Sequence, residues 1–102
     1  MLQLRSDVIQ LNSRRVAMMK PIQFSRHARE QMAERGAHED EVAEAIRIGE
    51  EIPAKEGRLG YRRNFQYERP WGGRTYAMKQ VVAIVVEEPD ALVVVTVYTF
   101  YF

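Results

Sequence analysis

Hydrophobic and polar residues alternate with two different periods along this chain of 102 residues. From Ser25 onward, apolar residues recur three or four positions apart, which is the spacing of an amphipathic helix. Ser25 is a suitable N-cap, and Gly36 and Gly49 stand where two such stretches end. The pattern predicts one helix over residues 25–35 and a second helix over residues 39–48.

The second helix is predicted to begin with a capping box. Acidic residues fill its first turn, where the helix dipole favours negative charge. His38 falls at the N-cap position, and Glu41 follows three residues later, at the position from which its side chain can accept from the cap's backbone N–H. We therefore interpret His38 as a structural residue.

After Pro53 the period changes to two, which is typical of β-strands. We predict a turn at RPWGG, residues 69–73, and a tight turn at EPDA with Pro89 at its first corner. The predicted strands lie near residues 60–68, 75–87 and 92–101. The fold class is therefore α+β, with two N-terminal helices packed on one face of a three- or four-stranded antiparallel β-meander in a single domain over residues 21–102.

Strict alternation assigns the side chains of the last strand to two faces. One face would carry Leu92, Val94, Thr96, Tyr98 and Phe100. Thr96 and Tyr98 would then hold two hydroxyl groups side by side, although both residue types also have a high strand propensity. A two-residue loop at EPDA would set Ala83 opposite Thr96 and Lys79 opposite Phe100, on the face of the two hydroxyls.

The first twenty residues have no steady period. Met18 and Met19 stand just before KPIQF, so translation could start near Met18 as well as at Met1. We predict that residues 1–20 form a flexible N-terminal extension. The alternative is a short helix or strand over Gln3–Leu11.

Composition excludes several classes of protein. The chain is 46% hydrophobic and 28% charged, as in soluble globular proteins, and it has neither an apolar run of spanning length nor a secretory signal pattern. It has no cysteine, which excludes disulfides and thiolate metal sites and is consistent with a reducing cytoplasm. Because its two histidines are separated by a helix and no nucleotide fingerprint is present, we predict neither a metal nor a cofactor.

Charge is segregated along the chain. Residues 1–29 hold six basic residues and one acid, whereas residues 30–56 hold nine acids and three basic residues. Residues 57–74 hold five arginines and one glutamate. Folding could unite the two basic segments in one positive face, which would attract polyanions.

His27 is the first candidate for chemistry. It falls in the first turn of the first helix, near the positive end of the helix dipole and between Arg26 and Arg29. These charges disfavour imidazolium, so His27 should be neutral and able to accept a proton, as a base acting on an RNA 2′-hydroxyl would. The alternative is a solvated histidine at a helix start.

Arginines alternate with aromatic residues in the middle of the chain. The arginines are Arg62, Arg63, Arg69 and Arg74, and the aromatic residues are Tyr61, Phe65, Tyr67 and Trp71. Guanidinium groups among aromatic rings are typical of surfaces that bind phosphates and unstacked bases. The alternative is a strand packed through its aromatic residues, with arginine stems along its edge.

Several segments resemble one family. The segment SRHAREQMAERG, an acidic second helix, YRRNF and the closing VVVTVY resemble a family of uncharacterised bacterial proteins that looks like a branch of the RelE/ParE-type toxin superfamily, with its barnase–EndoU–colicin–RelE-like fold. The resemblance covers residues 22–102. It implies two helices on a curved antiparallel sheet and RNA cleavage. It also implies a site made of His27, Arg63 or Lys79, Thr96 and Tyr98.

Three functions follow as hypotheses. The first is a metal-independent, toxin-type endoribonuclease held in check by an antitoxin-like protein, with His27 as base, Arg63 and Lys79 on the phosphate, and Thr96 and Tyr98 orienting it. His27 should then lie near Thr96 or Tyr98. The second is a non-catalytic module that binds RNA or a protein, with Arg26, Arg29, Arg62, Arg69, Arg74 and Trp71 as RNA contacts. The third is a homodimer formed through the strand TFYF.

Overall fold

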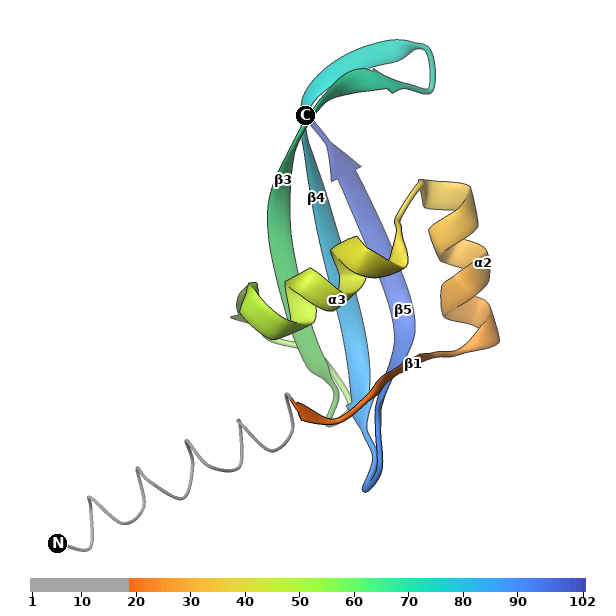
Figure 1. Ribbon diagram of the computed structural model, residues 1–102, viewed down its shortest axis with the longest axis vertical. Helices are drawn as coiled ribbons and strands as arrows, with labels where there is room; N and C mark the ends of the chain where they lie inside the picture. Colours follow the sequence, from red (N-terminus) through yellow and green to blue (C-terminus); the bar gives the residue numbers. More distant parts are fainter. Residues whose placement is uncertain (1–18) are drawn as a thin grey trace, which may run out of the picture.

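The computed structural model describes residues 19–102, which form an α+β fold with two helices on one side of a sheet (Figure 1). The elements in chain order are β1 (Ile22–Phe24), α2 (Arg26–Arg35), α3 (Glu39–Ile48), β2 (Glu50–Ile52), β3 (Leu59–Trp71), β4 (Arg74–Glu87) and β5 (Leu92–Tyr101). Most of the predicted extension over residues 1–20, its alternative over Gln3–Leu11 and the choice of start lie outside the described residues.

Both helices begin and end where the sequence predicts. The Ser25 hydroxyl accepts from the backbone N–H of Ala28 at 3.0 Å, and Gly36 ends α2 in the left-handed conformation. His38 is the N-cap of α3, and the Glu41 carboxylate accepts from the His38 backbone N–H at 2.9 Å. The structural interpretation of His38 is therefore confirmed.

The sheet is larger and less regular than predicted. Its strand order is β1-β5-β4-β3-β2, and β3, β4 and β5 form the expected antiparallel meander. However, β1 pairs in parallel with β5, so the sheet is five-stranded and mixed, and the prediction of three or four purely antiparallel strands is wrong. The two additional strands, β1 and β2, are three residues each, which is too short for a period of two to be recognised.

The turn between β3 and β4 is shorter than predicted. Strand β3 continues through residues 69–71, and Trp71 pairs with Arg74 across the turn. Only Gly72 and Gly73 form the loop, with φ angles of 58° and 84°. Positive φ at both central residues is the requirement of the tight hairpin turn that suits the twist of paired strands, and glycine meets it without strain.

A β-bulge in β5 corrects the predicted register. Val85 pairs with Val94, as a two-residue loop at EPDA requires, but the next pair is Ile84 with Thr96, so Val95 is the extra residue. Beyond the bulge every residue of β5 is displaced by one position, and Lys79 lies opposite Tyr101 instead of Phe100. A displacement of one residue exchanges the two faces of a strand.

The bulge therefore divides the predicted row of five residues between both faces. Leu92 and Val94 face the helices, as do Val97, Thr99 and Tyr101, whereas Thr96, Tyr98 and Phe100 face away from them. The core lies between the helices and the sheet. Its fully buried members include Ala28, Val42, Ile46, Val81, Ala83, Val85, Val94 and Val97.

Helix α2 covers the outer edge of β5 with two side chains. The Gln31 amide oxygen accepts from the backbone N–H of Val97 at 2.9 Å, and the Arg35 guanidinium donates to the Val97 carbonyl at 2.5 Å. Gln31 is buried, with 8% of its surface exposed. The two side chains thus replace the neighbouring strand that β5 lacks above β1.

Removing the Gln31 side chain should destabilise the fold. In Gln31→Ala the buried Val97 N–H loses its acceptor, so the free energy of unfolding should fall by about 1–3 kcal/mol, as measured by chemical denaturation. The control is Glu34→Ala, an exposed position on the same helix, which should change stability by less than ~0.5 kcal/mol. Equal, small effects of both substitutions would contradict the edge-covering role of Gln31.

Candidate functional site

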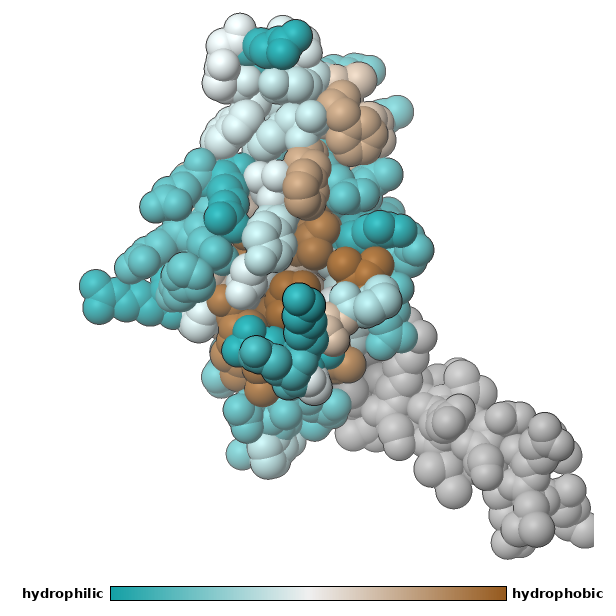
Figure 2. Space-filling model, turned by 180° about the vertical axis from the view of Figure 1, so that it is seen from behind, coloured by the Kyte–Doolittle hydropathy of each residue, from teal (hydrophilic) through white to brown (hydrophobic). Residues whose placement is uncertain are grey.

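Among residues 19–102, no element covers β4 or the upper half of β5 on the side of the sheet that faces away from the helices. We call this surface the open face (Figure 2). Its side chains stand in cross-strand rows set by the register of β3, β4 and β5. One row consists of Arg62, Val82 and Tyr98, and the next of Asn64, Gln80 and Phe100. Apolar side chains gather along the middle of this face between polar flanks (Figure 2).

Aromatic side chains form a column along β5 on the open face. Tyr98 is 42% exposed, Phe100 is 52% exposed, and Phe102 continues the same alternation at 56%. Phe102 is held in register because it exchanges two backbone hydrogen bonds with Met78, at 2.8 and 3.1 Å. We call these three residues the aromatic column.

A guanidinium group lies beside the lower end of this column. Arg35 extends from α2 around the edge of β5, and its guanidinium carbon lies 5.2 Å from the centre of the Tyr98 ring. The same group donates to the Val97 carbonyl, so its position is fixed by a hydrogen bond. A cation over an aromatic ring contributes about 0.5–1 kcal/mol at an exposed site.

A polar groove of about 470 Å³ flanks the open face at the start of β2. It is lined by Ile48, Gly49, Glu50, Arg62, Arg63, Asn64 and Gln80. The Gln80 amide nitrogen donates to the Asn64 amide oxygen at 2.8 Å. The Asn64 NH2 group, a donor, and the Gln80 amide oxygen, an acceptor, therefore remain for a ligand.

Glu50 holds Arg62 in a two-pronged ion pair at the rim of this groove. The Arg62 Nε and Nη2 atoms donate to the Glu50 carboxylate at 3.0 and 3.1 Å. The hydrogen bond from Arg62, together with its charge, lowers the pKa of Glu50, and the same contact raises the pKa of Arg62. Both groups are therefore ionised at neutral pH, and the Arg62 charge is largely matched by Glu50.

A second groove, of about 300 Å³, lies lower on the open face. The loop between β2 and β3 contributes Ala54, Lys55, Glu56 and Arg58, and the sheet contributes Ile84, Thr96 and Tyr98. The predicted pair of hydroxyl residues, Thr96 and Tyr98, therefore does share one surface. Two cations, Lys55 and Arg58, lie beside this pair, and Arg58 forms an ion pair with Glu56 at 4.0 Å.

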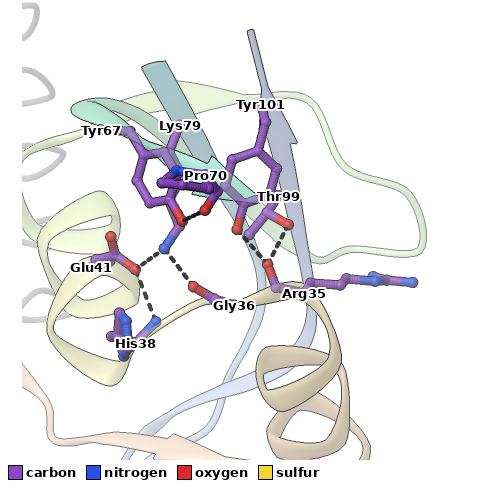
Figure 3. Close-up of polar contacts among 9 residues, drawn as sticks. All are labelled: Arg35, Gly36, His38, Glu41, Tyr67, Pro70, Lys79, Thr99 and Tyr101. Carbon is purple, nitrogen blue, oxygen red and sulfur yellow. Dashed lines mark hydrogen bonds and ion pairs between the residues drawn. The ribbon is translucent and has the colours of Figure 1, made fainter. Parts of the chain in front are cut away.

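Lys79 lies on the helix side of the sheet, where its ammonium group is held by contacts within the fold (Figure 3). Its side chain is 2% exposed, and its ammonium group donates to the Glu41 carboxylate at 2.7 Å and to the Gly36 carbonyl. It also lies 5.6 Å from the centre of the Tyr67 ring. These contacts tie β4 to the turn between α2 and α3, so Lys79 does not reach the open face and cannot contact a ligand there.

The same turn is fixed by the end of β5. The Thr99 and Tyr101 hydroxyls both donate to the Arg35 carbonyl, at 2.9 and 2.7 Å (Figure 3). Burial raises the pKa of the Tyr101 hydroxyl, so it remains a donor at neutral pH. Trp71 stacks on Tyr101 with ring centres 5.0 Å apart, and a Cβ atom at Gly36 would lie 2.6 Å from the Trp71 ring.

Arg63, which was predicted as a catalytic residue, and the remaining predicted RNA contacts are distributed over other surfaces. Arg63 forms an ion pair with Glu44 at 3.1 Å, and Arg69 lies over the Tyr67 ring at 4.9 Å. Arg26 pairs with Glu30, and Arg29 pairs with Glu39. Arg74 is exposed at the hairpin tip. Of the six residues proposed as RNA contacts, the structure places only Arg62 on the open face.

His27 lies apart from the two hydroxyl residues. It is exposed in the first turn of α2, and α2 packs on the helix side, whereas Thr96 and Tyr98 line a groove on the open face. The structure therefore does not form the expected cleft between His27, Thr96 or Tyr98, and Lys79. The expectation that Lys79 shares the face of the hydroxyls is wrong, because the bulge at Val95 displaces the register.

Sequence reasoning missed most of the open face. Asn64, Gln80, Lys55 and Arg58 were not singled out, and Phe100 was assigned to the face of Thr96 and Tyr98 but not proposed as a ligand contact. Within residues 19–102, no group of three or more histidine, aspartate or glutamate side chains could hold a metal ion. No helix in the same range is long and apolar enough to cross a membrane.

Lys79→Met should test the structural assignment of Lys79. Methionine keeps most of the volume but leaves Glu41 without its cation, so the free energy of unfolding should fall by about 3 kcal/mol in chemical denaturation. The double variant Lys79→Met, Glu41→Gln should regain part of this loss. Lys55→Met, at an exposed lysine, should change stability by less than ~0.5 kcal/mol. An unchanged stability of Lys79→Met would contradict this assignment.

Comparison with known proteins identifies the family. No curated protein and no solved structure matches the chain. The model of one family, described as a domain of unknown function (DUF4258), matches residues 24–99, which include α2, α3, β3, β4 and most of β5. The chain belongs to the DUF4258 family.

Proposed function

We propose that this protein is a non-catalytic module that binds single-stranded RNA on its open face. The aromatic column is the observation that carries the proposal, because three exposed rings stand on one strand of an uncovered sheet. Exposed aromatic side chains on a sheet are platforms on which unpaired bases stack, and each stacked base contributes about 1–3 kcal/mol to binding.

Polar groups on the open face fit the rest of a nucleotide chain. Arg35 beside Tyr98 and Lys55 in the lower groove are cations in position for phosphates, whereas Arg58 in that groove pairs with Glu56. The Asn64 and Gln80 amides stand in the same row as Phe100, and amide groups pair well with the edges of bases. Stacking groups, cations and amides are thus present on one surface.

Binding is favoured over cleavage by the distribution of the five residues proposed for catalysis. Thr96 and Tyr98 are on the open face, whereas Lys79 is buried on the helix side and Arg63 is paired with Glu44. His27 is exposed on α2. A base, a phosphate ligand and an orienting hydroxyl must lie within hydrogen-bond reach of one substrate, and this arrangement separates them.

The resemblance to the RelE/ParE-type toxin superfamily is consistent with RNA as the ligand. Under this proposal, the chain would retain the RNA affinity of such a fold and lack its nuclease chemistry. RNA binding would place the protein in the cytoplasm. An antitoxin-like partner is not required for a module that does not cleave RNA.

The proposal predicts that replacing the aromatic column weakens RNA binding. Fluorescence anisotropy with a labelled single-stranded RNA should show binding that falls steeply with salt, because phosphate contacts release counterions. The double variant Tyr98→Ala, Phe100→Ala should bind at least about tenfold more weakly, since two stacking contacts are lost. The RNA should remain intact on a denaturing gel.

His27→Ala is the matched control, because His27 is also an exposed ring but lies on α2. It should bind RNA as the wild-type protein does. Wild-type affinity retained by Tyr98→Ala, Phe100→Ala would contradict the proposal. Cleavage of RNA by the wild-type protein, abolished in His27→Ala, would replace it with the endoribonuclease.

Glu50→Gln should strengthen RNA binding by about twofold to fivefold, because Arg62 loses its ion-pair partner and becomes available to a phosphate. The pKa of Glu50 is lowered, so the wild-type pair persists at neutral pH and is lost as the pH falls below 4.5 through the lowered value. The affinity difference between variant and wild type should therefore narrow with acidification. Glu30→Gln, which removes the partner of Arg26 on α2, should leave the affinity unchanged.

A further inference from the structure

The outer edge of β5 is satisfied only in part. Below the bulge, Leu92 and Val94 direct their backbone groups outward to the chain around β1, where Leu92 N–H donates to the Pro21 carbonyl and Ser25 N–H donates to the Val94 carbonyl. Above the bulge, Val97 directs its groups outward to Gln31 and Arg35. The backbone groups at this edge are thus bound by the chain around β1 below the bulge and by the side chains of Gln31 and Arg35 above it.

The next two outward positions of β5 are uncovered. Met78 and Phe102 exchange backbone hydrogen bonds, so alternation turns the backbone groups of Phe100 toward β4 and those of Thr99 and Tyr101 away from it. Among residues 19–102, no group beyond this edge binds the outward N–H or C=O groups of Thr99 and Tyr101. Tyr98–Phe102 is therefore an open strand edge.

The opposite edge of the sheet is protected in ways that Tyr98–Phe102 is not. Strand β2 is three residues long and begins with Glu50 and Glu51. Above it, β3 is irregular between Gln66 and Arg69, with Glu68 at a positive φ of 49°, and contains Pro70. Charge, irregularity and proline are the usual devices that prevent pairing at an edge. The segment YTFYF has none of them.

We propose that Tyr98–Phe102 pairs antiparallel with the same segment of a second copy of this chain, forming a two-fold dimer with one continuous sheet. The register of this pairing follows from the hydrogen bonds that Gln31 and Arg35 already make to the Val97 backbone. Because the Val97 groups are occupied, only Thr99 and Tyr101 can exchange hydrogen bonds, so Thr99 of each copy lies opposite Tyr101 of the other. Phe100 then lies opposite Phe100.

A second copy fits this edge better than a charged peptide does. The segment is uncharged, so doubling it creates no like-charge repulsion. On the open face the pairing sets Phe100 beside its copy and Tyr98 beside Phe102, and such aromatic pairs contribute about 0.5–1.5 kcal/mol each. The two aromatic columns would then adjoin, although the pairing itself requires no RNA and does not rest on the proposed function.

Sedimentation velocity without RNA tests the dimer. The wild-type protein should shift from the 11.9 kDa monomer to twice that mass as the concentration is raised about a hundredfold. In Phe100→Glu, carboxylates would face each other at the dimer axis, so the protein should stay monomeric with its circular dichroism unchanged. Ile48→Glu, a second exposed apolar position at 61%, should still dimerise.

Amide hydrogen exchange of the wild-type protein supplies a readout that does not depend on a variant. The Thr99 and Tyr101 amides should exchange rapidly when dilute and slowly when concentrated, whereas the Val97 amide, bound to Gln31, should be slow throughout. A protein that is monomeric at every concentration would overturn the proposal. So would a dimer that persists in Phe100→Glu, or one that leaves the Thr99 and Tyr101 amides unprotected.

Discussion

The β-bulge at Val95 is the constraint on which the rest of the structure depends. It adds one residue to β5, so the strand changes faces between Val94 and Thr96. As a consequence, Leu92 and Val94 pack into the core below the bulge, and Val97 does so above it. A regular strand would instead point Val97 away from the helices and expose one face of the core.

The bulge also separates structural from candidate binding residues. On the helix side, Lys79, Thr99 and Tyr101 all contact the turn between α2 and α3, and Trp71 packs against Gly36 in the same place. On the open face, Tyr98 and Phe100 are left exposed. Beyond the bulge, residues adjacent in sequence therefore have different environments: the odd-numbered residues contact the helix side, and the even-numbered ones form the proposed RNA-binding surface.

The sequence predicts the elements of this fold better than it predicts their register. Both helices and all three long strands carry caps or long alternating stretches, and they were placed correctly except at the end of β3, which continues through residues 69–71. The bulge was not foreseeable, because VVVTV is β-branched on both faces and shows no polar mark at the extra residue. Lys79 was the one available signal of the true register, because a lone lysine within an apolar strand needs a partner on its own face. That partner, Glu41, is 38 residues away, so the sequence does not identify it.

The register of β5 decides which side chains share a face, so the unforeseen bulge affected the site predictions more than the predictions of helices and strands. Thr96 and Tyr98 were recognised as a pair, and they do line one groove. Lys79, Leu92 and Val94 were assigned to the face of this pair, and the one displaced residue places all three on the opposite face. Arg63 and Trp71 are engaged by Glu44 and Tyr101, contacts that only the tertiary structure shows.

Short-range NMR contacts between the Hα atoms of β4 and β5 test this account most directly. In an antiparallel pair, residues that do not exchange hydrogen bonds have their Cα atoms about 4.5 Å apart, so their Hα atoms nearly touch. The bulged register predicts such contacts for Ala83 with Val97 and for Val81 with Thr99. A contact of Val81 with Tyr98 would instead show a regular strand and contradict the division of the sheet into a structural face and a binding face.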